Sequence, residues 1–307
     1  MTAPRHVTVP SDAGARAHAN RIGMIAMVAC FAVFIVNDTL VKDASEGMPS
    51  GQTIFLRGCF STILTFIAAC IAGQWRLRAH MQMPVLCGRA AFDAIGSVGY
   101  LIALFHLPIG NATAINSTAP LMLTAAAALI LGEYVGFRRW SAILVGFLGI
   151  VLVIQPASDG FNAWSILALV ATAMNIGRDL VTRRIDPGTP ALLVTLIGSM
   201  GVTIAAGIFM LLEGWKPPSM GYLLELLMAS GFLSAGYFLL VIAMRNGEIS
   251  LVSAFRYTAI PMALLIGWLR WGEIPNALAW LGLCLLVGAG LYVIHRERVR
   301  RRHALRS

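Results

Sequence analysis

The sequence has few charged residues and almost no lysine. Asp, Glu, Lys and Arg make up 12% of the 307 residues, whereas apolar residues make up 58%. A soluble domain carries about 25% charged residues, so this composition excludes a soluble protein of this length and indicates an integral membrane protein. Its two lysines, Lys42 and Lys216, follow Val41 and Trp215 rather than glycine, so the chain has no Walker A loop. ATP-driven transport within this chain is therefore excluded.

Motifs for metal binding, disulfide bonds and hydrolysis are also lacking. The 5 cysteines lie singly within apolar runs, without the paired spacing of a metal knuckle or a disulfide framework. The sequences HExxH and Gly-x-Ser-x-Gly do not occur. We therefore expect no enzyme, no catalytic residues, no metal site and no cofactor.

The net charge of +9 comes mostly from arginines in the terminal segments and in short connections between apolar runs. No basic face of a soluble fold is available for nucleic acid, whereas membrane proteins retain Lys and Arg on the cytoplasmic side. With the tails 1–20 and 297–307 in the cytoplasm, 16 of the 23 basic residues lie inside, 3 outside and 4 within spans. We expect a protein of the bacterial inner membrane with both termini cytoplasmic. Its expected partners are lipids and a small-molecule substrate, and a monomer and a homodimer both stay open.

Apolar runs of roughly the 20 residues that cross a bilayer occupy almost the whole chain. They lie at 21–40, 51–74, 83–105, 110–132, 138–155, 161–183, 189–212, 219–244, 249–271 and 276–295. The connections between them are short, so no soluble catalytic domain is expected. The pattern predicts an all-α integral membrane protein with ten transmembrane helices.

Two of the runs share a pattern, an apolar stretch with a central proline that ends in a Gly-Glu pair; these are Gly110–Glu133 and Glu248–Glu273. The prolines, Pro120 and Pro261, leave the carbonyls of Asn116 and Tyr257 without a helical partner. In lipid such a break is tolerated only where protein or a water-filled cavity covers it. We therefore expect both breaks to line one central cavity, although ordinary kinks packed against neighbouring helices are the alternative.

The two halves of the chain repeat each other. An offset of 141 residues aligns four pairs, Asp38 with Asp179, Lys42 with Arg183, Pro49 with Pro190 and Pro120 with Pro261, and an offset of 140 aligns the two Gly-Glu pairs. Each half, 21–155 and 161–296, has five spans, and an odd number forces opposite polarity in the membrane. Such inverted repeats are typical of carriers that work by alternating access.

Taken together, these features resemble a known family. Two five-helix units, each with a proline-broken fourth helix, a Gly-Glu pair and a glycine-rich last span, are similar to the EamA-type branch of the drug/metabolite transporter superfamily. The resemblance covers the chain from about Arg21 to Arg296. It implies a ten-helix basket around a central substrate cavity and the export of amino acids or related metabolites, as in YddG-type exporters. Other members move riboflavin or nucleotide derivatives.

Charged residues within spans are costly in lipid and are candidates for function. Arg89 and Asp93 are four residues apart, on one helix face. Near the midplane, Asp93 is a candidate to accept a coupling proton or to meet a substrate ammonium group. The alternative is a structural ion pair with Arg89.

Arg256 and Tyr257 precede the proline of the ninth span, so we expect both side chains to face the cavity. An arginine there can hold a substrate carboxylate through two hydrogen bonds. Pairing of Arg256 with Asp93 or with a backbone carbonyl is the alternative. Arg57 is interpreted as structural or as extending toward the headgroups.

Polar residues near the ends of the first and sixth spans are interpreted as gates. Asn175, Arg178 and Asp179 form the expected inner cluster, and Asn175 and Arg178 are also candidates to line the cavity. Asn37 and Asp38 are the expected outer counterpart. Capping and charge pairing at helix ends would also explain them.

Three tyrosines, Tyr100, Tyr237 and Tyr257, fall inside spans, whereas tryptophans lie near span ends as in aromatic belts. The tyrosines are candidates to stack on a ring-bearing or apolar substrate, or to pack with a buried partner for each hydroxyl. Glu133 and Glu273 are expected only to fix the turn after each broken helix.

The function that these features favour is secondary transport by alternating access, with export of amino acids or related small metabolites. An importer of a nucleotide-like compound or a vitamin such as riboflavin is the alternative with the same fold. A channel needs a ring of repeated ligands or a re-entrant loop, which the short connections do not offer. Substrate, direction, coupling ion and captured conformation do not follow from the sequence.

Overall fold

The structure is a computed structural model that describes residues 13–74, 83–130, 136–155, 163–182, 184–186, 188–246 and 252–304. These residues are almost entirely helical. The helices are α1 Ala13–Gly47, α2 Ser50–Ile71, α3 Met83–His106, α4 Ile109–Asn116, α5 Ala119–Ile130, α6 Phe137–Ile154, α7 Ala163–Thr182, α8 Ala191–Glu213, α9 Met220–Asn246, the 3₁₀-helix η2 Ser253–Thr258, α11 Ala259–Trp271 and α12 Ala277–Ala304.

Within this described part, nine helical segments are long and apolar enough to cross a membrane. Helices α4 and α5 count there as one span, Ile109–Ile130. The ninth predicted span, 249–271, is divided into η2 and the 13-residue α11, so it is no single long helix. Together they give the all-α membrane fold that the sequence predicts.

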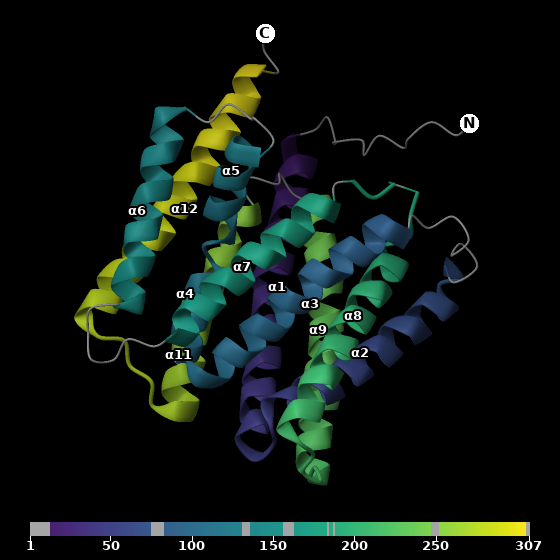
Figure 1. Ribbon diagram of the computed structural model, residues 1–307. Helices are drawn as coiled ribbons and strands as arrows, with labels where there is room; N and C mark the ends of the chain where they lie inside the picture. Colours follow the sequence, from purple (N-terminus) through teal and green to yellow (C-terminus); the bar gives the residue numbers. More distant parts are fainter. Residues whose placement is uncertain are drawn as a thin grey trace.

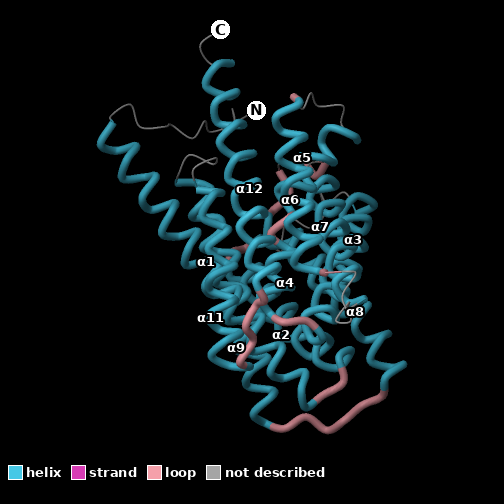
Figure 2. The backbone as a smooth tube through the Cα atoms, turned by 90° about the vertical axis from the view of Figure 1, so that its left-hand side faces the viewer, coloured by secondary structure: helices cyan, strands magenta, loops and turns pink. Residues whose placement is uncertain are grey.

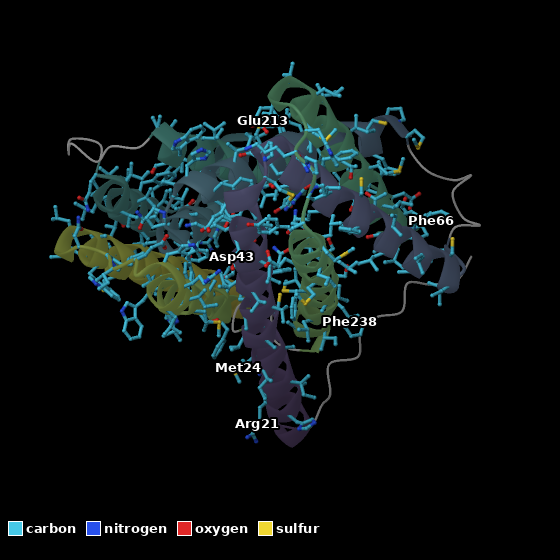
Figure 3. All side chains as sticks on the ribbon, turned by 90° about the horizontal axis from the view of Figure 1, so that it is seen from below. Arg21, Met24, Asp43, Phe66, Glu213 and Phe238 are labelled. Atoms are coloured by element: carbon cyan, nitrogen blue, oxygen red, sulfur yellow. The ribbon has the colours of Figure 1, made fainter. Side chains whose placement is uncertain are left out.

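The first and last helices are longer than the apolar runs that predict them. Helix α1 begins at Ala13, inside the segment expected as a tail, and α12 continues to Ala304. The polar ends continue as helix because Ala and Arg favour helix and no proline interrupts them. Helix α1 also crosses the bundle obliquely, with Arg21 at the edge and Asp43 near the middle (Figure 3). A tilted helix needs more residues to cross the same thickness.

Packing between the halves follows a two-fold pattern. Helix α1 packs along α9, and α7 packs along α3 (Figure 1). Exchanging the halves turns the first pair into the second, because α1 corresponds to α7 and α9 to α3. The pairs α2 with α8 and α6 with α12 each consist of two equivalent helices, so exchanging the halves leaves these pairs unchanged. The halves are therefore related by a pseudo-two-fold axis, as in an inverted repeat.

One contact marks this axis. The hydroxyl oxygens of Thr62 on α2 and Thr203 on α8 lie 3.1 Å apart, and the two residues are 141 positions apart in the chain. That separation is the offset at which the sequence repeats. Equivalent residues of two halves touch each other only where the axis passes between them. Helices α2 and α8 run antiparallel, since Gly51 lies against Met210 and Gly58 against Thr203, so the axis that relates them lies in the membrane plane.

The paired helices α6 and α12 form a separate side of the bundle, on the left in Figure 1. A Cβ atom on Gly149 would lie 2.6 Å from the carbonyl oxygen of Gly282, so these backbones are in direct contact. Small residues allow such close packing of membrane helices, which accounts for the glycine-rich last span of each half.

Both predicted helix breaks lie beside a proline. Helix α4 ends at Asn116 before α5, and η2 precedes α11. Pro120 and Pro261 lie in the first turn of α5 and α11, where a missing N–H costs little. Thr118 and Thr258 each donate a 2.6 Å hydrogen bond to the carbonyl three residues earlier. Both halves therefore contain the same hydrogen bond from a threonine hydroxyl beside the helix break.

The two ends of the bundle are named here by the helices that begin or end there. We call the side where α1 begins and α12 ends the terminal side, and the opposite side, where α1 meets α2 and α11 meets α12, the distal side. Figure 2 shows the described loops of the distal side at the bottom.

Candidate functional site

A polar cluster, here called the central cluster, joins the first three helices and consists of Asn37, Asp38, Arg57 and Tyr100. The Tyr100 hydroxyl donates a 3.0 Å hydrogen bond to Asp38 Oδ2, and the Asn37 amide donates a 2.8 Å bond to Asp38 Oδ1. Arg57 Nε donates to Asn37 Oδ1 at 3.4 Å. Asp38 lies nine residues before the end of α1, or roughly 14 Å along the helix, which places it well inside the span.

Arg57 is 8% exposed, so it does not extend to the headgroups. Among the described residues, its two terminal nitrogens donate no hydrogen bond, and its single bond is the long one to Asn37. It lies within electrostatic range of Asp38, Tyr100 and Tyr237. Arg57 is thus part of a buried polar cluster, so of the two sequence interpretations the one that extends it toward the headgroups is wrong.

Tyr237 of α9 faces the same interior. Its ring makes an edge contact with Phe34 at 5.4 Å, and it lies within electrostatic range of Arg57, Asp93 and Arg178. Nevertheless, 45% of Tyr237 is accessible. Tyr237 is thus accessible although it lies near charged groups of α2, α3 and α7.

A second cluster, the terminal cluster, lies between α3 and α7 toward the terminal side. Asp93 accepts from Arg178 Nη1 at 3.0 Å, from Arg89 Nη1 at 3.4 Å and from Ser97 at 3.3 Å. Arg178 also pairs with Asp179 at 2.9 Å, and the Asp179 side chain is 49% exposed. The predicted Arg89–Asp93 pair is thus present as one link of a larger network.

The two clusters are not copies of each other. At the offset of 141, Arg57 corresponds to Gly198 and Tyr237 to Gly96. A Cβ atom on Gly198 would lie 2.6 Å from Asp93 Oδ2, so this glycine makes room for the terminal cluster. The backbone is therefore pseudo-symmetric, whereas the polar side chains that it carries differ between the halves.

Other predicted residues lie apart from these clusters. Asn116 is exposed at the end of α4. The Oδ1 atom of Asn175 is buried without a hydrogen-bond partner and lies against Gly96. Tyr257 is 4% exposed and its ring packs against Gly290 of α12. This differs from the expectation that Tyr257 faces a cavity, because the 3₁₀ geometry of η2 turns its side chain toward α12.

Arg256 lies with its guanidinium carbon 5.8 Å from the ring centre of Phe31 on α1, in a cation–π geometry. It does not pair with Asp93, whose cationic partners are Arg89 and Arg178. That alternative is therefore wrong, because the two guanidinium groups from α3 and α7 already occupy both oxygens of this carboxylate.

On the distal side, an ion pair that we call the distal lock joins Lys42 of α1 to Glu273 after α11. The Lys42 Nζ atom lies 2.9 Å from Glu273 Oε1 and donates to the Leu107 carbonyl at 2.6 Å. Glu273 Oε2 accepts from the backbone N–H of Ile109 at 2.8 Å. Lys42 also lies 4.6 Å from the ring centre of Trp271. One pair of charges thus ties together α1, α3, α4 and α11.

Two further contacts flank the distal lock. Arg270 pairs with Asp43 at 3.1 Å, and the Trp271 indole donates to Glu46 at 3.0 Å. The sequence interpretation gave Glu273 only a turn-forming role and assigned Lys42 none. The available signal was the repeat, which aligns these residues with Glu133 and Arg183. Both counterparts lie outside the described residues.

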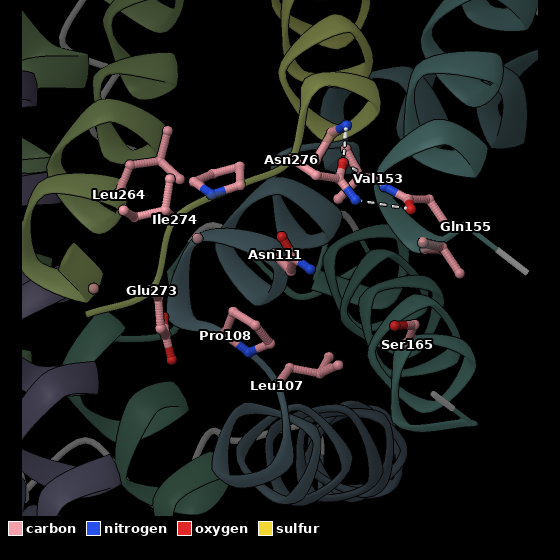
Figure 4. A pocket seen from close by; sticks show the side chains of 15 residues that line it. Leu107, Pro108, Asn111, Val153, Gln155, Ser165, Leu264, Glu273, Ile274 and Asn276 are labelled. Atoms are coloured by element: carbon pink, nitrogen blue, oxygen red, sulfur yellow. Dashed lines mark hydrogen bonds between the residues drawn. The ribbon is translucent and has the colours of Figure 1, made fainter. Parts of the chain in front are cut away.

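Next to the distal lock is a pocket of about 620 Å³, lined by α4, α6, α7 and the connection from α11 to α12. Glu273 forms part of its wall and the Asn111 side chain extends into it (Figure 4). Gln155 and Asn276 close one side through two amide hydrogen bonds of 2.7 and 3.0 Å. The pocket lies at the distal end of the bundle, and Glu273 belongs both to its lining and to the distal lock.

The fold and these clusters define a class of protein: a membrane transporter, built from two inverted repeats, that is not an enzyme. The chain belongs to the EamA-like transporter family, whose sequence profile it matches over residues 21–155 and 162–295. It is thus a member of the drug/metabolite transporter superfamily.

Relatives of this chain carry different substrates. It is 29% identical over 256 residues to a riboflavin transporter of Rhizobium johnstonii, covering 83% of this chain and 84% of that protein. It is 26% identical to the pseudopaline exporter CntI of Pseudomonas aeruginosa, covering 87% and 93%. It is 25% identical to an S-adenosylmethionine uptake transporter of Rickettsia prowazekii, covering 86% and 89%.

A solved structure has a TM-score of 0.60 to this chain at 16% identity, and it covers 91% of this chain and 97% of its own. This similarity concerns the fold alone. The relatives' names include both uptake and export. Membership of the family therefore establishes transport of a small molecule, but neither its identity nor the direction of transport.

Proposed function

We propose that this protein is a secondary transporter of the bacterial inner membrane that exports amino acids or related zwitterionic metabolites by alternating access. Its terminal side faces the cytoplasm, as the distribution of basic residues favours. The central cluster binds the substrate. The distal lock closes the periplasmic side in the conformation described.

The observation that carries this proposal is the arrangement of Arg57 and Asp38. Both lie in the central cluster, yet they do not form an ion pair, because the Asn37 amide bridges them. A buried guanidinium with free terminal nitrogens is able to hold a carboxylate through two hydrogen bonds. The Asp38 carboxylate is able to receive an ammonium group. An amino acid carries both groups and complements both charges.

The charges inside the bundle favour a substrate with a carboxylate. Toward the middle of the spans lie four arginines, Arg57, Arg89, Arg178 and Arg256, against three aspartates, Asp38, Asp93 and Asp179, whereas Glu225 lies five residues from the start of α9. The terminal cluster balances two of each, which leaves Arg57, Arg256 and Asp38 for the substrate. Buried charges are retained at such cost only where they have partners or a function.

The closed distal lock favours loading from the terminal side. Lys42 and Glu273 join four helices there, whereas Asp179 and Tyr237 have accessible side chains on the path from the terminal side. A substrate bound at the central cluster would leave after the lock opens. The pocket beyond the lock is then the exit vestibule, where Asn111 offers an amide to a departing polar molecule.

Uptake of a riboflavin-like vitamin is the second candidate, because the similar protein of Rhizobium johnstonii bears that name. The accessible ring of Tyr237 would stack on an aromatic ring system. Riboflavin has no carboxylate or ammonium group, so its transport would not need both Arg57 and Asp38.

Counterflow in proteoliposomes tests the proposal with radiolabelled leucine, histidine, aspartate, riboflavin and S-adenosylmethionine as probes. We expect exchange of at least one amino acid, and a reduction of about 100-fold in Arg57→Gln from the loss of about 3 kcal/mol of charge-assisted hydrogen bonding. Arg256→Gln tests the other free arginine, and Lys216→Gln is the control outside the site. Exchange of riboflavin alone, unaffected by Arg57→Gln, would replace the first candidate by the second.

A further inference from the structure

The three aspartates within the spans differ in their partners. Asp93 lies within 3.4 Å of guanidinium nitrogens of both Arg89 and Arg178, and Asp179 lies 2.9 Å from Arg178. Asp38 receives hydrogen bonds only from neutral groups, the Tyr100 hydroxyl and the Asn37 amide. Among the described residues, no cationic nitrogen lies within 4.0 Å of the Asp38 carboxylate. Among these three aspartates, Asp38 is therefore the one whose charge has no direct counterion.

Such a carboxylate has two ways to avoid the free-energy cost of an uncompensated charge away from water. It is neutralised by a proton, or it receives a cation that enters the site. Both of its oxygens already accept hydrogen bonds, which hold the group in place in either state. Exchange between a proton and a cationic group therefore changes the charge and the hydrogen bonds at one fixed position on α1.

The charged and titratable groups around Asp38 come from every helix packed against α1. Those on α2, α3 and α9 are near: Arg57, Tyr100 and Tyr237. Those on η2 and α11 are engaged elsewhere: Arg256 lies over Phe31, Tyr257 packs against Gly290, and Arg270 pairs with Asp43. On α1 itself the groups are His18, Arg21, Cys30, Lys42, Asp43 and Glu46, and on α9 Glu225 lies within electrostatic range of Asp43. Arg57 is thus the one nearby cation without an ion pair among these described residues.

Asp38 is also linked to the distal lock. Lys42 follows it by four residues, so both side chains lie on one face of α1. On this face, Asp38 accepts a hydrogen bond from Tyr100 of α3, and one turn later Lys42 donates a hydrogen bond to the carbonyl of Leu107, which directly follows α3. A change at Asp38 that moves α1 relative to α3 would act on the distal lock one helical turn away.

We propose that Asp38 is the proton-binding carboxylate that couples transport to the proton gradient. This proposal rests on the proposed function, because the second occupant of Asp38 is the ammonium group of the exported substrate. When the site faces the terminal side, the ionised carboxylate binds the ammonium group. When the lock opens, a proton from the distal side binds Asp38 and the substrate leaves. The proton is released on the terminal side, which gives antiport.

This assignment differs from the sequence interpretation, in which Asp93 is the candidate for the coupling proton. The reason is the two guanidinium groups at Asp93, which already compensate its charge. A proton arriving there would have to displace an ion pair, whereas a proton arriving at Asp38 displaces nothing among the described residues.

Infrared difference titration of the purified full chain tests the proton site without any substrate. On acidification we expect a carboxylic acid band in the wild type that is absent from Asp38→Asn, identified as the difference between the two titrations because the other 13 Asp and Glu side chains contribute to both. Asp93→Asn and Asp179→Asn should retain it. In Tyr100→Phe, which removes only the hydroxyl that donates to Asp38, we expect the midpoint of the same band to shift, and in Asp38→Glu the band should change frequency. A band that persists in Asp38→Asn, or that is lost in Asp93→Asn, overturns the proposal.

A transport measurement separates this proposal from the proposed function. Proteoliposomes are loaded with the radiolabelled amino acids used for counterflow, and a pH gradient is imposed. We expect the gradient to raise efflux about tenfold per pH unit in the wild type, following the ratio of protonated to ionised carboxylate. In Asp38→Asn we expect exchange without gradient-driven efflux.

The outcomes of the two experiments are distinct. Absence of amino-acid exchange in the wild type contradicts the proposed function, while the infrared titration still decides whether Asp38 binds the proton. Exchange whose dependence on the pH gradient is unchanged in Asp38→Asn contradicts the coupling role of Asp38 and leaves the proposed function intact. If Asp38→Asn does not fold, the band shifts in Tyr100→Phe and Asp38→Glu decide.

Discussion

Replacing Lys42 with methionine should open the distal side. Methionine keeps the length of the side chain and removes the charge and the donors. The variant loses the 2.9 Å ion pair with Glu273, the 2.6 Å bond to the Leu107 carbonyl and the contact with Trp271. Glu273 keeps its bond from the Ile109 N–H. In the open state Glu273 is hydrated, so the loss falls on the closed state alone.

The size of the effect follows from the geometry. At 2.9 Å and an effective dielectric constant of 20, the attraction between unit charges is about 6 kcal/mol, before desolvation is subtracted. Breaking a buried ion pair costs about 3 to 5 kcal/mol. The side chains are 10% and 21% exposed, so water reduces the effect and we use the lower value. About 3 kcal/mol corresponds to roughly a 100-fold shift toward the open state.

Thiol accessibility measures this shift. A cysteine at Thr113, which is 4% exposed and lies one turn beyond Ile109 on α4, is introduced into a variant without the five native cysteines. A membrane-impermeant methanethiosulfonate reagent is added from the distal side. We expect Lys42→Met to raise the rate of modification of this cysteine by about 100-fold, the factor by which the open population grows.

The control is Lys216→Met, since Lys216 contacts Gln52 through its backbone only. Glu273→Gln should raise the rate less than Lys42→Met, because Lys42 then keeps its hydrogen bond to the Leu107 carbonyl and its contact with Trp271. The double variant should add little to Lys42→Met, since both changes remove one interaction. An unchanged modification rate in Lys42→Met, or equal rates in Lys42→Met and Lys216→Met, would refute the assignment of this pair as a lock.

Two further predictions concern folding. Gly282→Leu should prevent α6 and α12 from approaching, because the Gly149 carbonyl occupies the space of the new side chain. The peak of folded protein in size-exclusion chromatography should then be lost. Gly288→Leu is the control on the same helix, and it should fold normally because the space around Gly288 is open. Asp93→Asn leaves Arg89 and Arg178 without their shared carboxylate and should lower the melting temperature by at least about 5 °C, whereas an unchanged melting temperature would show that the terminal cluster contributes little to stability.

The sequence by itself determined the architecture. Composition excludes a soluble chain, and the spacing of apolar runs predicts the helices, because the cost of leaving backbone groups unpaired in lipid makes helix the local solution. The offset of 141 residues predicts the inverted repeat, and Thr62 and Thr203, separated by that number, meet on its axis. These properties depend on short segments or on their order in the chain.

The tertiary structure alone decided which polar groups meet. Lys42 and Glu273 are 231 residues apart, and Arg178 and Asp93 are 85 apart, so no local pattern pairs them. Arg57 lies in the central cluster rather than near the headgroups, and Tyr257 packs on Gly290 rather than facing a cavity. The face that a helix turns inward depends on its rotation, its tilt and the residues of its neighbours. The spacing of apolar residues predicts the rotation of a membrane helix poorly, because the faces that contact lipid and the faces that contact protein are both apolar.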